Sequence, residues 1–180
     1  MDWTEAILGV INLRSFSSLW YWIAVAVLWS SVSHWVLGVP FDLITRARRK
    51  GGEAEQDLID ITRVNVNRLL TIQETSAYWL IGIASFVVSS LLILSFFYDV
   101  EFAQALCFLV IPLCAVGALS FRDARKIRDE VEDVQMLYRA LSAHRLWTQG
   151  IGMVSIFLTA LYGMLQNLEL LRHDLSLPPF

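Results

Sequence analysis

The 180-residue sequence contains little cysteine and no excess of basic residues. Its two cysteines, Cys107 and Cys114, fall in one apolar run. Their spacing puts them about 10 Å apart along a helix, which is too far for a disulfide within it. They are expected to be small apolar core residues. The net charge of −3 excludes a general nucleic-acid-binding protein, because phosphate recognition requires a basic surface.

Recognisable enzyme motifs are also missing from the sequence. It has no glycine-rich phosphate loop, no cluster of cysteines and no spacing of residues typical of metal ligands. We therefore predict no catalytic residue, no cofactor and no metal site. The N-terminus lacks a basic region followed by a short apolar stretch and a small-residue cleavage site. The first apolar run is consequently expected to remain in the mature protein.

Long apolar runs, in contrast, are abundant. Hydrophobic residues make up 56% of the chain and its mean hydropathy is +0.55, whereas soluble domains are about 45–50% apolar. Runs of about 18 residues or more can cross a hydrocarbon layer as helices, and the absence of apolar–polar alternation excludes a β-barrel. We predict an all-α polytopic membrane protein, a single membrane domain over residues 1–180 with four transmembrane helices. The expected spans are residues 16–39, 76–98, 102–121 and 146–165.

Both charged segments between these spans are predicted to contain amphipathic helices. Residues 53–75 are acidic at the start and basic later, which suits the helix dipole, and they can run directly into the second span. Within residues 122–144, opposite charges recur four residues apart and apolar residues recur at spacings of three and four. This pattern predicts a helix with an apolar seam made of Ile127, Val131, Val134, Tyr138 and Leu141.

The seam requires a cover, because apolar area left in water is unfavourable by about 25 cal/mol per Å². A straight helix over residues 122–142 would be about 30 Å long. It cannot stand upright on the membrane, because the linker after it is too short to reach back to the start of the fourth span. We expect it to lie along the membrane surface, to bend back on itself or to be shorter. Lipid, the 53–75 helix or a partner protein can cover the seam. Our docking hypothesis assigns a partner to Val131, Val134, Tyr138 and Leu141.

Lys and Arg residues are distributed very unevenly along the chain. Of the 14, six lie between the first and second spans and six between the third and fourth, while Arg14 and Arg172 lie outside these segments. Cytoplasmic loops of membrane proteins carry an excess of Lys and Arg. We therefore predict that segments 40–75 and 122–145 are cytoplasmic and that both termini are periplasmic.

Four stretches of the chain carry a resemblance to a known family. They are residues 1–3 (MDW), 15–22 (SFSSLWYW), 34–42 (HWVLGVPFD) and 46–49 (RARR). Together they resemble a family of small four-span alphaproteobacterial membrane proteins, often labelled "component of SufBCD complex". The resemblance runs through most of the chain. It implies a location in the bacterial inner membrane and, through the label, a link to iron–sulfur cluster assembly, but it implies no functional residues.

Polar side chains in the first span are candidates for an intramembrane role. His34 lies near the predicted cytoplasmic end of that span, with Ser30 one turn before it and Ser33 beside it. An ionisable residue within a span is a functional candidate, although such a face can equally bond to neighbouring helices. His144 lies at the same predicted depth before the fourth span, and two histidines at one depth can ligate a b-type haem.

Small residues recur at helical spacing in two other spans. Such stripes let transmembrane helices approach closely. We therefore predict that they mark faces of helix packing. The stripes are Ser155, Thr159 and Gly163 in the fourth span and Ser85 and Ser89 in the second.

Three functions remain compatible with these features. The first is a non-enzymatic accessory or scaffold subunit that docks a larger membrane complex or forms a homo-oligomer, with membrane lipids around it and no nucleic-acid partner. The second is a small oligomeric channel or transporter around Ser30, Ser33 and His34, although pumps usually carry charged residues in mid-membrane. The third is a haem-binding membrane redox subunit.

Overall fold

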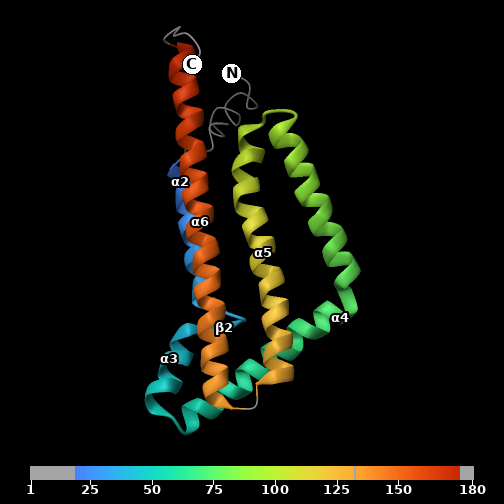
Figure 1. The fold of residues 1–180 in the computed structure, drawn as a ribbon, viewed down its shortest axis with the longest axis vertical. Coiled ribbons are helices and arrows are strands. Elements are labelled where there is room, and N and C mark those ends of the chain that lie inside the picture. Colours follow the sequence, from blue (N-terminus) through green and yellow to red (C-terminus); the bar gives the residue numbers. More distant parts are fainter. Residues whose placement is uncertain (1–18, 132, 175–180) are drawn as a thin grey trace, which may run out of the picture.

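The computed structural model describes residues 19–131 and 133–174. Figure 1 shows long helices running side by side, joined at the lower end by a layer of shorter segments. The prediction of an all-α chain is confirmed for this part, apart from one very short hairpin. The elements in chain order are α2 (Leu19–His34), β1 (Trp35–Val36), β2 (Val39–Pro40), α3 (Phe41–Lys50), α4 (Glu53–Phe96), α5 (Glu101–Glu130) and α6 (Val134–Asp174).

Three helices, α4, α5 and α6, are long and apolar enough to cross a membrane. They contain the apolar runs expected at residues 102–121 and 146–165 and the run expected at 76–98 as far as Phe96, where α4 ends. The 16 described residues of α2 extend about 24 Å, which is less than the thickness of a hydrocarbon layer. The start of the first predicted span, residues 16–18, lies outside the described residues.

The first apolar run ends earlier than predicted. We expected a helix as far as residue 39, but α2 ends at His34 and an antiparallel hairpin follows, with Trp35 opposite Pro40. Leu37 and Gly38 both have positive φ, at 51° and 78°, which is the backbone of a tight two-residue hairpin turn. The Asn65 side chain donates a hydrogen bond to the Gly38 carbonyl at 3.0 Å and attaches the turn to α4.

Helix α4 bends where its charged half meets its apolar half. Ser76 leaves the helical conformation, with φ −126° and ψ 15°, so the predicted continuous helix is present but kinked. Figure 1 shows that the first half of α4 runs across the lower end of the molecule and that the second half turns upward beside α5. The kink therefore converts a helix lying across the bundle into one that runs along it.

The chain reverses direction at residues 131–133, whereas we predicted one helix over 122–144. Helix α5 continues to Glu130 and α6 already begins at Val134. Val131 is extended, with φ −91° and ψ 102°, and ends α5. Of the three arrangements that the short return linker allowed, the structure has the one in which the segment bends back on itself. The physical reason is that a reversal here lets apolar residues of both arms face α4.

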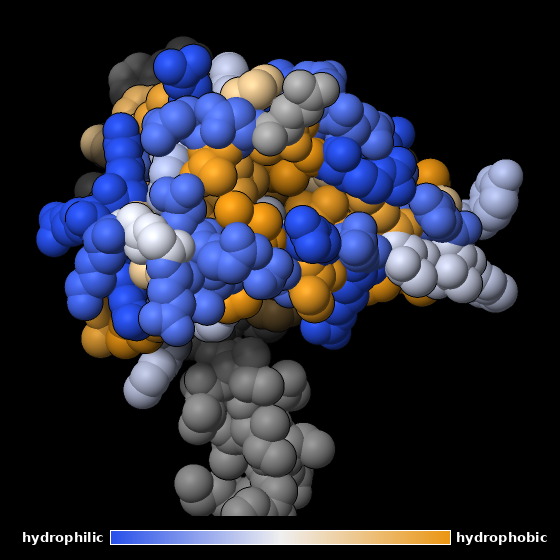
Figure 2. All heavy atoms as spheres, turned by 90° about the horizontal axis from the view of Figure 1, so that it is seen from below, coloured by the Kyte–Doolittle hydropathy of each residue, from blue (hydrophilic) through white to orange (hydrophobic). Residues whose placement is uncertain are grey.

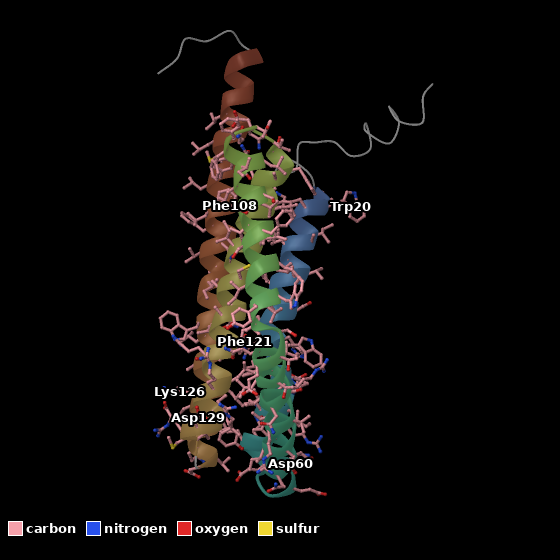
Figure 3. All side chains as sticks on the ribbon, turned by 90° about the vertical axis from the view of Figure 1, so that its right-hand side faces the viewer. Trp20, Asp60, Phe108, Phe121, Lys126 and Asp129 are labelled. Carbon is pink, nitrogen blue, oxygen red and sulfur yellow. The ribbon has the colours of Figure 1, made fainter. Side chains whose placement is uncertain are left out.

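The segments at this end carry most of the positive charge, and we call residues 41–75 and 122–145 the charged end. Figure 2 views this end from below and shows hydrophilic side chains around smaller apolar areas. In Figure 3, Asp60, Lys126 and Asp129 lie at this end and Trp20 of α2 lies near the other. Both predicted cytoplasmic segments are thus at one end of the molecule.

A hydrophobic core closes the charged end. It joins the hairpin with residues of α3, α4, α5 and α6, and Val39, Leu58 and Leu141 at its centre have no exposed area. A smaller core in the apolar half contains Val25, Trp29 and Val116. The residues of this core lie outside the long apolar runs of α4, α5 and α6, so their burial stabilises the charged end through the hydrophobic effect.

Candidate functional site

A buried aspartate–histidine pair lies where the charged end meets the apolar half of the bundle. Asp123 follows the apolar run of α5 by two residues and His144 precedes that of α6. The Nδ1 atom of His144 lies 2.8 Å from Oδ2 of Asp123, and the two residues are 3% and 9% exposed. The pair joins two antiparallel helices at residues 21 positions apart in sequence.

The second carboxylate oxygen of Asp123 faces a cation at the surface. Arg122 donates to Oδ1 from Nε at 3.2 Å and from a terminal nitrogen at 3.1 Å. Asp123 is therefore bonded on both oxygens, which is the arrangement that a largely buried carboxylate requires. The outward arginine and the inward histidine hold the carboxylate between solvent and the bundle interior.

His144 also lines a cavity of about 350 Å³. Helices α2, α4, α5 and α6 and the hairpin turn all contribute to its wall, so it lies at a convergence of elements. Mostly apolar side chains line it, with Ser31, Ser120 and His144 as the polar members. Pockets that bind small molecules in helical bundles share this composition, a mainly apolar wall with a few convergent polar groups.

More buried polar atoms surround the pair along α6. Thr148 lies one turn beyond His144, and its hydroxyl is buried without a hydrogen-bond partner among the described residues. Arg145 places its guanidinium 3.4 Å from the centroid of the Phe41 ring, a cation–π contact that ties α6 to α3. Its Nε is likewise buried and unpaired within the described part of the chain.

The first-span candidates do not join this site. Ser30 and His34 are exposed and Ser33 is half-buried. The His34 ring packs edge-on against Trp35, with centroids 5.8 Å apart. The neighbouring Ser31, which sequence analysis did not single out, lines the cavity instead. The two histidines considered as haem ligands are therefore in different surroundings, because the cavity wall contains His144 but not His34.

The small-residue stripe of α6 lies inside the bundle. Ser155 is 4% exposed and Thr159 is 2% exposed, and Gly163 is also buried. The Ser155 hydroxyl donates to the Phe108 carbonyl of α5 at 2.7 Å. Nearby, Gln166 donates to Gln104 at 3.3 Å, so uncharged polar side chains connect α5 and α6 through the apolar half.

Ser85 and Ser89 of α4 are placed differently. Both are exposed, and Ser89 donates only to the Phe86 carbonyl of its own helix, at 3.1 Å. Gly82, one turn before Ser85, has no atom within 4 Å of the position that a Cβ would take, apart from its own helix and neighbours. Within the described chain, this small-residue face of α4 thus has no packing partner.

The docking hypothesis for the apolar seam is wrong. Tyr138 is 4% exposed and Leu141 has no exposed area, and both belong to the core of the charged end. Val131 and Val134 pack against the same core. The reversal at residues 131–133 folds the two halves of the seam onto α3 and α4, which buries Tyr138 and Leu141 within the chain and leaves Val131 and Val134 half-buried.

Sequence reasoning identified His144 but missed Asp123. The prediction for this segment was based on opposite charges four residues apart on one helix. Asp123 has no oppositely charged residue at that spacing. Its position was a usable signal, because it is the first acidic residue after the apolar run of α5 and sits at the depth predicted for His144. Only the reversal between α5 and α6 determines which carboxylate meets the imidazole.

Among the described residues no group of three or more His, Cys, Asp or Glu side chains is arranged to hold a metal ion. Cys107 is buried and Cys114 is exposed, and both are free thiols. No protein-family model, curated protein or solved structure matches the chain.

Proposed function

We propose that the protein is a non-enzymatic accessory or scaffold subunit of a membrane assembly, and that the apolar half of α4 is its assembly surface. The observation that carries this proposal is the uneven burial of the three long helices. In their apolar windows, 6% of the residues of α4 are buried within the chain, against 28% in α5 and 22% in α6. Lipid or another protein therefore covers almost the whole apolar half of α4.

The small residues of α4 indicate that another protein, and not lipid alone, covers part of its apolar half. Gly82, Ser85 and Ser89 recur at spacings of three and four, so they share one exposed face. Faces of this kind let a second helix approach the backbone closely and gain van der Waals contact that flexible lipid tails provide less well. We infer that a helix of a second copy or of a larger complex packs on this face.

The same proposal gives the protein a membrane orientation. Helix α2 would belong to the fourth span, beside α4, α5 and α6. The charged end would face the cytoplasm, because it holds twelve of the 14 Lys and Arg residues. Both chain termini would then be periplasmic. The resemblance described above supports the bacterial inner membrane as the location.

Substitution of one small residue of α4 tests the assembly surface. In Ser85→Leu a bulky side chain would separate the helices, so we expect a lower mass of the purified complex in mild detergent, measured by light scattering. Ser90→Leu is the matched control, since it introduces the same change about 140° around the helix. A monomeric wild-type protein that co-purifies with no other protein, or an equal effect of both variants, would contradict the proposal.

A further inference from the structure

The cavity beside the buried Asp123–His144 pair presents hydrogen-bond acceptors. An ionised carboxylate only accepts hydrogen bonds, so the Asp123–His144 contact places the proton of the neutral imidazole on Nδ1. The Nε2 atom is then left with a lone pair, and it has no hydrogen-bond partner among the described residues. His144 lines the cavity, where it therefore offers an acceptor rather than a donor.

The Ser120 hydroxyl oxygen is a second hydrogen-bond acceptor in the cavity wall. The Ser120 hydroxyl donates its proton to the Val116 carbonyl of its own helix at 2.9 Å, so its oxygen is left to accept. Ser120 lies one turn before Asp123 on α5 and, like His144, lines the cavity. Two acceptors on facing helices thus border the cavity, whose wall also includes Ser31 and is otherwise mainly apolar.

The mouth of the cavity includes exposed residues near the boundary of the apolar half. Trp35 is 54% exposed and Ser31 is also exposed, and both line the cavity. Tryptophan is typical of the interface between lipid and water. A molecule dissolved in the outer part of a lipid layer can therefore reach the cavity without passing through the core of the charged end.

We propose that this cavity binds a membrane-soluble amphiphile with an apolar body and a hydroxyl head that donates a hydrogen bond to Nε2 of His144. The apolar residues Val32, Leu69 and Val116 contact the body. Asp123 is a positioning residue, because it orients the ring and fixes its tautomer without touching the ligand. The volume of about 350 Å³ is within the range of ligand sites and accommodates a substituted ring.

The tautomer of His144 is the first test, and it uses the intact protein in lipid nanodiscs. The chain has three histidines, so ¹⁵N-histidine labelling gives few ring signals, and the Nδ1 and Nε2 pair that is lost in His144→Gln belongs to His144. We expect protonated Nδ1 and unprotonated Nε2 for the neutral ring. A neutral ring protonated on Nε2 would overturn the proposal, because the cavity would then present a donor.

Two matched probes test the ligand class. 4-Octylphenol and 4-octylanisole have the same apolar body, but the methyl ether of the second has no O–H to donate. We expect 4-octylphenol to shift the His144 Nε2 resonance saturably, and 4-octylanisole to bind about tenfold more weakly, as the loss of one hydrogen bond predicts. Equal shifts with both probes, or no shift with 4-octylphenol, would reject the assignment.

A pair of variants locates the binding within the cavity. Ser31→Phe places a bulky ring in the cavity wall and is expected to abolish the shift caused by 4-octylphenol. Ser30→Phe makes the same change at the neighbouring exposed residue, which does not line the cavity, and should leave the shift intact. Loss of the response in both variants, or in neither, would place the phenol elsewhere. These results are independent of the oligomeric state and so of the proposed assembly through α4.

Discussion

Gly152 lets the Trp29 ring pack directly on the backbone of α6. A Cβ atom at this position would lie 2.7 Å from Cε3 of Trp29 and 3.0 Å from Cδ2. Trp29 is 6% exposed and belongs to the small core of the apolar half, so its ring has little freedom to move away. The contact fixes how closely α2 approaches α6.

We predict that Gly152→Ala destabilises the protein by about 1–3 kcal/mol, as overpacking of a filled core does. Gly150→Ala is the matched control, because a Cβ there meets nothing within 4 Å. Alanine favours a helix over glycine by up to about 1 kcal/mol, so the control should be neutral or stabilising. Thermal unfolding in detergent measures both, and equal melting temperatures would contradict the close contact.

Tyr138 predicts a dependence of stability on alkaline pH. Burial raises the pKa of this phenol above the usual 10.0, and the negative charge and hydrogen bond of Glu55, whose Oε2 lies 3.5 Å away, raise it further. Because the pKa is raised in the folded state, the neutral phenol stabilises the fold below pH 10 and this contribution is lost as the pH rises through the folded-state pKa.

Tyr138→Phe should therefore lose less stability than the wild type between pH 9 and pH 11, a range that brackets the usual phenol value of about 10. Chemical denaturation at a series of pH values checks this, with the exposed Tyr98→Phe as the control that leaves the profile unchanged. Parallel profiles for the wild type and Tyr138→Phe would contradict the burial of this hydroxyl.

At the scale of the element, the α5–α6 reversal is what joins the charged end into one core. Leu141 of α6 is fully buried and packs in the same cluster as Leu58 of α4 and Ile127 of α5. Residues on the two sides of the break at 131–133 therefore stabilise each other only when the hairpin is closed.

We expect Leu141→Ala to destabilise the protein by about 2–5 kcal/mol, the usual range for a buried leucine. Leu146→Ala removes the same atoms at a position that is 70% exposed and should have little effect. The melting temperatures of the two variants provide the measurement. A small effect of Leu141→Ala would restore the possibility that the seam is a surface.

At the scale of the whole molecule, the two ends differ in charge and in packing. The charged end has its own core, whereas the apolar half has a smaller core and leaves most of α4 uncovered. This division matches a protein that is held together by the hydrophobic effect where it meets water and by close helix contacts where it meets lipid.

Cysteine labelling in intact cells tests the orientation. In a background with Cys107 and Cys114 replaced, Tyr98→Cys lies between α4 and α5 at one end, and Glu53→Cys begins α4 at the other. We expect a membrane-impermeant maleimide to label the first variant in intact cells and the second only after lysis. The reverse pattern would place the charged end in the periplasm.

Patterns along the chain alone predicted the helical class, the three long apolar segments and the gathering of positive charge in two segments. These features depend on local composition, because apolar length and charge are read directly along the chain. The sequence also indicated His144 as a candidate functional residue, because it lies just before the last apolar run at the predicted membrane depth of His34. It placed the end of the first helix too late, because the hairpin after His34 depends on burial of Leu37 and on the Asn65 hydrogen bond to Gly38.

The contacts that these residues make depend on how the helices pack together. The same seam of apolar residues suits a partner protein, a membrane surface or an internal core, and the reversal at residues 131–133 selects the core. The pairing of Asp123 with His144 depends on the register of two antiparallel helices, which no local pattern encodes. The cavity between α2, α4, α5 and α6 likewise exists only because helices distant in sequence converge beside that pair.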